Sequence, residues 1–239
     1  MAVIETYVDG DAIPGGAGTS GDPYGGWIEW EANEGTNLII DGDTHIVYVK
    51  NEDVETASLL INGFTDDATH YVTIKAWPGH EVNGSYTTGG AFKTSVASRA
   101  ILNYAEFLRM EDVRVESTSA GYNQLLQQVW VGATDIRHDR CVFVTSQADP
   151  ILKSGGNYGG TVLFRKCIMD SSVSIDTNTK ASGSIDLYNN TIFGRTIIRA
   201  VSTVNAKNNI IDTADAYLVY SGYTLNGTNN THSQADVSD

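Results

Sequence analysis

An apolar pattern that returns every 19 to 36 residues constrains this chain more than any other feature. Apolar side chains stand five and three positions before an anchor residue and two positions after it. The anchors of the five clearest repeats are Val113, Cys141, Cys167, Asn190 and Asn209. In their fifteen apolar positions, His138 is the only polar residue. Weaker repeats are anchored at Asn51 and Trp77 before these and at Asn230 after them. A fixed strand phase with variable spacing predicts strands that stack in register, joined by corners of different length.

The local patterns agree with a parallel β-solenoid, in which each repeat forms one rung. Short alternating runs such as "HIVYVK" and "TVLFRKCIMD", bounded by Gly, Asn, Asp and Ser, are typical of strands. Residues 22–35 ("DPYGGWIEWEANEG") can hold a short amphipathic helix, and residues 97–108 fit either a helix or a strand. We therefore expect a cap over residues 1–45, with an N-terminal strand and a Gly-rich loop. The solenoid is expected over 46–222 and a polar tail over 223–239.

Paired asparagines in "LYNNTIFG" and "AKNNIIDT" recur at the same phase and predict the corners of the coil. Asparagine tolerates the left-handed backbone of a sharp corner, and its amide can hydrogen-bond to the amide of the next rung. Cys141 and Cys167 share that phase and lie 26 residues apart, which is one repeat. We expect them on adjacent rungs, buried and reduced, because the chain has no other cysteine and no zinc-binding spacing.

The composition excludes several classes of partner. The chain carries 29 acidic and 15 basic residues, for a net charge of −14. This balance argues against nucleic acid and against anionic membranes, since both are bound through clustered Lys and Arg. No apolar run approaches the roughly 20 residues that span a bilayer. The first residues, "MAVIETYVDGD", lack a basic start and an apolar segment, so we expect no signal peptide and synthesis in a cytoplasm.

Several segments resemble right-handed parallel β-helix proteins of the pectin-lyase-like superfamily. "YVDGDAIPGGAGTSGDPYGGWIEWEAN" is similar to the N-terminal strand, Gly-rich loop and capping helix of that superfamily, and "DGDTHIVYVK" to the strand that follows. "EDVRVESTS", "NNTI" and "NNII" are similar to its rungs. The resemblance extends over most of the chain and is strongest to uncharacterised β-helix proteins of tailed bacteriophages. It implies an all-β fold: a single right-handed parallel β-helix of about seven rungs with an N-terminal cap.

The resemblance implies a role in a bacteriophage virion. We expect a head decoration or cement protein, or a spike, that binds capsid or tail proteins and forms a homotrimer. The alternative is a tail-associated β-helix protein that binds or degrades polysaccharide, with a host glycan as its partner. A fold does not identify an activity, so enzymatic function stays open, with a non-enzymatic role favoured.

Acidic motifs do not single out a catalytic or metal site. Asp66 and Asp67 form a lone "DD" pair, whereas the other motifs of polygalacturonase-like members of the family are absent. The two "DGD" segments, at residues 9–11 and 41–43, fall in the cap, where a Gly between acids favours a turn over a calcium loop. We predict no catalytic residues, no metal ligands and no cofactor. A carboxylate pair across a groove, as glycosidases use, remains an alternative.

The candidate binding residues lie in the longest step between anchors, from Trp77 to Val113, where about ten residues exceed an ordinary repeat. Surplus residues are expected to leave a coil as a surface loop, and such loops carry binding. His80, Tyr86 and Phe92 are aromatic within residues 79–97, so they are the predicted contact residues. A solvated corner without function is the alternative. His138 falls in an inward position and is predicted to be a hydrogen-bonded core histidine.

Overall fold

The computed structural model describes residues 2–35, 38–50, 52–55, 58–82, 91–95, 99–117, 124–129, 135–145, 150–155, 160–177, 183–198, 203–212, 217–219 and 224–232. The helices are α1 (Trp27–Glu34) and α2 (Leu38–Asp41). The strands are β1 (Val3–Asp9), β2 (Thr44–Lys50), β3 (Glu52–Glu55), β4 (Leu59–Ile61), β5 (Val72–Ala76), β6 (Ala91–Thr94), β7 (Arg99–Asn103), β8 (Phe107–Glu111), β9 (Arg114–Ser117), β10 (Gln124–Val129), β11 (Asp135–Asp139), β12 (Val142–Thr145), β13 (Pro150–Gly155), β14 (Thr161–Arg165), β15 (Ile168–Thr177), β16 (Ser184–Tyr188), β17 (Thr191–Ile198), β18 (Thr203–Lys207), β19 (Ile210–Ile211), β20 (Tyr217–Val219), β21 (Thr224–Thr228) and β22 (Thr231–His232). The fold is therefore all-β, as predicted.

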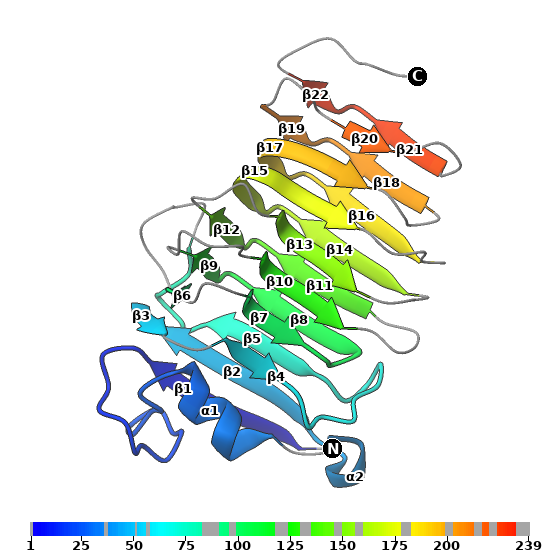
Figure 1. Ribbon diagram of the computed structural model, residues 1–239. Coiled ribbons are helices and arrows are strands. Elements are labelled where there is room, and N and C mark those ends of the chain that lie inside the picture. Colours follow the sequence, from blue (N-terminus) through cyan, green and yellow to red (C-terminus); the bar gives the residue numbers. More distant parts are fainter. Residues whose placement is uncertain are drawn as a thin grey trace.

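Nine strands form one parallel sheet in the order β1-β2-β5-β8-β11-β14-β16-β18-β21. Each strand pairs with the next one visited by the chain, so the sheet is a stack that rises from the N-terminus to the C-terminus (Figure 1). We call the segment from one of these strands to the next a lap.

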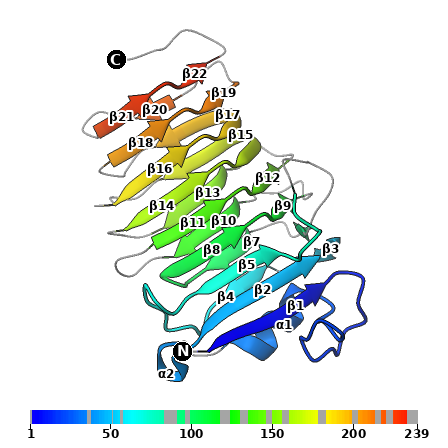
Figure 2. The ribbon, with the colours of Figure 1, turned by 180° about the vertical axis from the view of Figure 1, so that it is seen from behind.

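The rest of each lap belongs to a second, thirteen-stranded sheet, whose pairings are also parallel (Figures 1 and 2). On one path β3, β6, β9, β12 and β15 follow one another, and on the other β4, β7, β10 and β13 lead to the same β15. The long strands β15 and β17 take part in both paths, with an irregular register near Val173. Side chains that alternate along the strands therefore enclose one core between the sheets.

The predicted register is confirmed from Trp77 to Asn230. The structure pairs Val72 with Leu108, Ile136 with Val162, and Val204 with Leu225, as the repeats require. The first repeat is wrong by one residue: His45, Val47 and Val49 face the core, whereas the predicted Ile46 and Tyr48 are half-buried on the outer face. In this strand both faces carry apolar residues, so hydrophobicity alone did not fix its phase. The predicted anchor Asn51 lies outside the described residues.

The corners after the nine-stranded sheet share a left-handed residue directly before the anchor. These residues are Asp112, Arg140, Lys166, Asn189, Asn208 and Asn229, with φ between 55° and 58°. The asparagine pairs lie at corners, as predicted, and the two residues of each pair have different roles. The first asparagine adopts the left-handed conformation, while the second, at the anchor, is directed into the stack.

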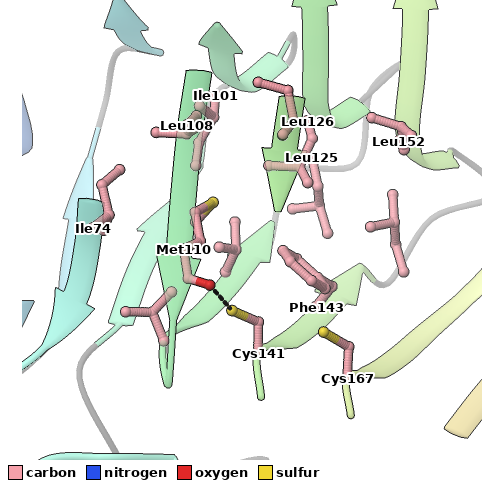
Figure 3. Packing of buried hydrophobic residues seen from close by; sticks show 14 of the residues in the cluster. Ile74, Ile101, Leu108, Met110, Leu125, Leu126, Cys141, Phe143, Leu152 and Cys167 are labelled. Atoms are coloured by element: carbon pink, nitrogen blue, oxygen red, sulfur yellow. Dashed lines mark hydrogen bonds between the residues drawn. The ribbon is translucent and has the colours of Figure 1, made fainter. Parts of the chain in front are cut away.

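Anchor side chains form one continuous buried column. Cys141 and Cys167 lie on adjacent laps, free and buried, as predicted. Each Sγ donates to a backbone carbonyl of the preceding lap at 3.4 Å: Cys141 to Met110 (Figure 3), and Cys167 to His138. Asn190 and Asn209 donate to the equivalent carbonyls of Phe164 and Leu187 at 3.0 and 2.9 Å. Thiols and amides therefore fill the same role in successive laps.

The core narrows towards the C-terminus. Three positions before successive anchors stand Met110, His138, Phe164, Leu187, Ala206 and Gly227. From Phe164 onward each of these residues is smaller than the last. The steps between anchors shorten from 28 residues to 19 and 21 over the same laps. A smaller cross-section needs smaller side chains to keep the interior close-packed.

The N-terminal cap contains the predicted helix. Trp30 of α1 is fully buried, its indole Nε1 donates to Thr6 Oγ1 at 3.0 Å, and its ring stacks on Phe64. Residues 18–24 lie along β1, which is already the first strand of the nine-stranded sheet. At the other boundary β21 and β22 extend both sheets into residues 224–232, which were expected to form a tail. Residues 99–103 form β7, so the strand alternative holds there.

Candidate functional site

The outer face of the nine-stranded sheet carries a group of charged side chains linked by ion pairs. Its outward positions fall into two columns that run across the strands. One column holds Thr73, Arg109, Arg137 and Leu163, and the other holds Lys75, Glu111, Asp139 and Arg165. The pleat sends these side chains outward because their neighbours in sequence, such as Met110 and His138, face the core.

A groove of about 240 Å³ lies on this face. Its lining comes from strands β5, β8, β11 and β14 and from the residue before β5: Tyr71, Thr73, Arg109, Met110, Glu111, Arg137, Asp139, Leu163 and Arg165. The guanidinium of Arg109 lies 4.9 Å from the centre of the Tyr71 ring, within cation–π range. The groove therefore combines an aromatic ring with three planar hydrogen-bond donors.

Arginine–carboxylate pairs connect neighbouring strands across the groove. Asp135 accepts from Arg109 Nη2 at 2.9 Å and from Arg137 Nη2 at 2.7 Å. Asp139 accepts from Arg165 Nη2 at 2.5 Å and from Arg140 Nη1 at 2.7 Å. Burial of the Asp139 carboxyl by itself raises its pKa. The hydrogen bond from Arg165 and the charge of Arg140 outweigh burial, so the pKa of Asp139 is lowered. This carboxylate is held ionised.

A second group on the same face lies nearer the N-terminus. The rings of Tyr7 and Tyr48 stack with centroids 5.1 Å apart, and Trp77 packs against Tyr7 at 4.7 Å. Lys50 Nζ lies 4.4 Å from the Trp77 ring and 3.0 Å from Asp9 Oδ2. Both tyrosine hydroxyls point to the exposed carboxylate of Glu5, at 3.2 and 3.4 Å. Burial, with the charge of Glu5, raises the pKa of Tyr7 and Tyr48.

The three predicted contact residues are not brought together in the described structure. His80 is half-buried in the turn after β5, where its backbone N–H donates to the carbonyl of Trp77 at 2.8 Å. Tyr86 lies outside the described residues. Phe92 lies in β6, and its backbone pairs with Asp53 and Val115. Residues 91–94 are therefore a strand of the second sheet, so Phe92 does not belong to the roughly ten surplus residues that were expected to form a surface loop.

The acidic motifs have structural partners. Asp66 is buried and accepts from the backbone N–H groups of Glu106 and Phe107, and burial raises its pKa. Asp67 is half-buried and closes a turn by accepting from Thr69 and His70, and the Thr69 hydrogen bonds lower its pKa. In the cap, Asp43 accepts from the backbone of Ala2 at 2.8 Å. Within the part of the chain that is described, no three His, Cys, Asp or Glu side chains gather as metal ligands would.

His138 is buried, as predicted, but it is not fully hydrogen-bonded. Its Nδ1 has no hydrogen-bond partner among the described residues, and its ring lies 4.7 Å from Phe164 and 5.4 Å from Phe143. Burial, together with the nearby charge of Arg109, lowers its pKa to about 3. The register placed this histidine correctly, whereas its aromatic surroundings come from other laps and could not be foreseen.

Sequence reasoning missed the arginine-lined groove. A signal existed, because Arg109, Arg137 and Arg165 occupy the outward positions of three consecutive repeats. The repeat pattern defines only the inward, apolar positions and the anchor. The outward positions alternate with the apolar ones, so the pattern does not predict which residues they carry.

Comparison with known proteins adds no relative: no family model, no curated protein and no solved structure matches the chain. No described helix is long and apolar enough to span a membrane.

Proposed function

We propose that the chain is a single right-handed parallel β-helix of about seven rungs and serves as a structural protein of a bacteriophage virion. Successive strand groups visit the two sheets in the same order, which supports the helix: β2–β4, β5–β7, β8–β10, β11–β13, β14–β15, β16–β17 and β18–β20. Right-handedness follows from the strong preference of parallel β-crossover connections for that hand, in about 98% of cases.

The ionised, paired carboxylates of the groove support a non-enzymatic role. Glycoside hydrolysis needs a carboxylic acid that keeps its proton, and therefore a raised pKa. Asp139 has a lowered pKa and two arginine partners, and Glu111 lies 3.4 Å from Lys75 Nζ. These carboxylates fasten one strand to the next. A stack held in this way suits a durable part of a particle.

In the virion the protein acts as a head decoration or cement protein, or as a spike, in contact with capsid or tail proteins. Three chains associate side by side as a homotrimer, since the flat flanks of a β-helix offer extended surfaces for a closed symmetric assembly. Mass spectrometry of purified virions tests the location. Light scattering tests the trimer, which has three times the 25.8 kDa mass of one chain. Absence from virions contradicts the virion role, and a monomer that is present on virions contradicts the trimer.

A second candidate function, binding of a host polysaccharide on the tail, is favoured by the groove beside Tyr71. An aromatic ring next to several planar donors offers both a stacking surface and hydrogen bonds to a glycan. Calorimetry with polysaccharides from the host surface tests it. Arg137→Ala should abolish any binding, whereas Asn205→Ala, on the same face but outside the groove, should not. Absorbance at 235 nm over time reports lyase cleavage, for which we expect no signal.

A further inference from the structure

Two arginines of the groove, Arg137 and Arg165, have half-exposed side chains although a carboxylate already holds each of them. Arg137 donates from Nε and Nη2 to the two carboxylate oxygens of Asp135, at 2.9 and 2.7 Å. Arg165 donates from the same two nitrogens to Asp139, at 3.1 and 2.5 Å. A bidentate contact fixes the plane of a guanidinium as well as its position. Both groups are therefore held in one orientation at the surface.

The third guanidinium nitrogen of each arginine remains unused. Nη1 of Arg137 and Nη1 of Arg165 donate to no acceptor among the described residues. The carboxylates beside them are already engaged, because Asp135 also accepts from Arg109 and Asp139 from a second arginine. An Nη1 atom carries two N–H groups, so the pair offers four donors to an acceptor from outside the chain.

Arg109 has a structural part in this arrangement, because its side chain is largely buried, with 13% of its area exposed. Its Nη1 donates to the carbonyls of Leu108 and Asp135, and its Nη2 donates to the Asp135 carboxylate at 2.9 Å. The ring of Tyr71 lies 4.9 Å from the same guanidinium. Arg109 thus positions Asp135, which in turn orients Arg137.

The charges of the groove favour a negatively charged ligand. Three arginines line it against two carboxylates, Glu111 and Asp139, whereas the whole chain has a net charge of −14. The hydrogen bond to Asp135 raises the pKa of Arg137, and the charge of Arg165 acts against that rise, as expected for two like charges in proximity. An anion between the two guanidiniums relieves this repulsion.

The strand register sets the distance between the two exposed arginines. Arg137 pairs with Leu163 in the register between β11 and β14, so Arg165 stands one strand over and two residues further along. A strand spacing of about 4.8 Å and a rise of about 3.3 Å per residue place the two Cα atoms about 8 Å apart. In an extended peptide, side chains two residues apart point to the same side at about 6.6 Å. Acidic side chains at alternating positions of such a segment therefore match the two guanidiniums.

We propose that the groove binds an extended acidic segment of a partner protein, whose Asp or Glu side chains pair with Arg137 and Arg165. Two carboxylates at alternating positions of the segment each accept from one Nη1 atom. Leu163 lies beside both arginines in the register and offers an apolar surface to the methylene groups of the bound side chains. Arginines often anchor protein interfaces, so these two side chains should contribute most of the affinity. The proposal rests on the virion role, since capsid or tail proteins are the partners expected there.

The lining of the groove favours a protein segment over a glycan. Among the described residues that line it, Tyr71 is the only aromatic one, and the Arg109 guanidinium already lies against its ring. This leaves less aromatic surface on which a sugar can stack. A carboxylate needs no such surface, because charge-assisted hydrogen bonds hold it.

Fluorescence anisotropy tests the site with a labelled peptide of alternating Glu and Ser residues. The same peptide with Gln in place of Glu is the control for charge. At low ionic strength the Glu peptide should bind and the Gln peptide should not, and added salt should weaken binding because it screens the charges. Arg137→Gln and Arg165→Gln should each raise the Kd at least about ten-fold, since each removes one charge-assisted contact.

Lys207→Gln is the matched variant, because Lys207 is exposed in the same outward column as Arg165 but lies outside the groove. It removes the same charge and should leave the Kd unchanged. Circular dichroism of the three Gln variants should match the wild type, because the substituted side chains are exposed. Arg137→Lys keeps the charge but not the planar fork, so it should bind more weakly than the wild type and more tightly than Arg137→Gln.

The proposal is overturned if the wild type leaves the Glu peptide unbound at about 1 mM. It is overturned equally by an unchanged Kd in Arg137→Gln and Arg165→Gln, or by the same loss of binding in Lys207→Gln. Binding of polygalacturonate without binding of the Glu peptide would contradict it as well and assign the groove to a glycan.

Mass spectrometry of purified virions separates this question from the virion role. A protein that is present in virions and leaves the peptide unbound contradicts the acidic segment alone. A protein that binds the peptide but is absent from virions contradicts the virion role alone.

Discussion

The middle of the stack and its C-terminal end join neighbouring laps by different means. In the middle, large apolar and aromatic side chains such as Phe143 and Phe164 fill the core, and arginine–carboxylate pairs cross the outer face. Towards the C-terminus the equivalent inward positions hold the small residues Ala206 and Gly227. There, hydrogen bonds between asparagine side chains join neighbouring laps. Asn190 Nδ2 donates to Asn209 Oδ1, and Asn209 Nδ2 donates to Asn230 Oδ1, each at 3.0 Å. A column of amides satisfies itself, so a narrow stack can bury polar groups where little hydrophobic area remains.

The largest expected effect is on the core of the middle laps. Phe164→Ala should lower the free energy of unfolding by about 3 to 5 kcal/mol, because it removes a fully buried ring and leaves a cavity. Ala206→Gly, in the same column near the C-terminus, should cost about 0.5 to 1 kcal/mol. Urea denaturation followed by circular dichroism measures both. Equal losses of unfolding free energy at the two positions would mean that the smaller core residues near the C-terminus contribute as much to stability as the large ones in the middle.

The second effect concerns the amide column. Asn209→Ala should cost about 3 kcal/mol, because buried Asn190 loses the acceptor of its N–H and Nδ2 groups and the Leu187 carbonyl loses its donor. Asn208→Gly is the matched control, since Asn208 is exposed and glycine keeps the left-handed corner. It should stay near the wild-type stability. If Asn208→Gly lowered the stability and Asn209→Ala did not, the left-handed corner rather than the amide column would be the source of the stabilisation.

The third effect is a pH dependence of stability that arises from His138 in the middle laps. His138 has a pKa of about 3 when folded, against an ordinary value of 6.5. The unfolded chain therefore binds the proton more readily, so the contribution is complete above pH 6.5 and is lost as the pH falls towards 3. Between pH 7 and pH 5 the loss is about 2 kcal/mol, at about 1.4 kcal/mol per unit below 6.5. Urea denaturation at the two pH values measures it.

His138→Phe is the control for that titration. It keeps an aromatic ring between Phe143 and Phe164 and should show a smaller loss of stability over the same pH interval than the wild type. An unchanged loss would assign the titration to another group, of which His45 is the first candidate because burial lowers its pKa as well.

The smallest effect is electrostatic. Arg137→Gln should cost about 0.2 to 1 kcal/mol, since this side chain is half exposed and its pair with Asp135 is screened by water and salt. Salt at 1 M should reduce that difference, because screening acts within about 3 Å at this ionic strength. The cost of Asn209→Ala should not respond to salt. A salt-independent Arg137→Gln cost would indicate packing of the side chain stem.

Much of the fold could be predicted because its register depends on short sequence patterns. Inward positions are apolar in nearly every lap, and one anchor fixes the phase of the whole strand. The prediction failed at β2, where Ile46 and Tyr48 are outward and His45 is inward, so both phases were equally apolar. The step from Trp77 to Val113 predicted about ten surplus residues, but the length of a lap does not tell which residues return to the sheet, and residues 91–94 do so as β6.

The candidate site was less predictable, since it depends on contacts between laps. Arg109 and Asp135 are 26 residues apart in sequence, and their pairing follows from the register between β8 and β11, in which Asp135 pairs with Phe107. Such information resides in the assembled backbone and not in any single segment.

Each strand of the nine-stranded sheet pairs with residues close behind it in the sequence. Across both sheets, paired residues are separated by between 19 positions, as for Ser184 and Thr203, and 42, as for Leu59 and Ile101. A ribosome releases the chain in that order, so each lap finds its neighbour already present and needs to close only a short loop. The cap is complete before the first full lap emerges.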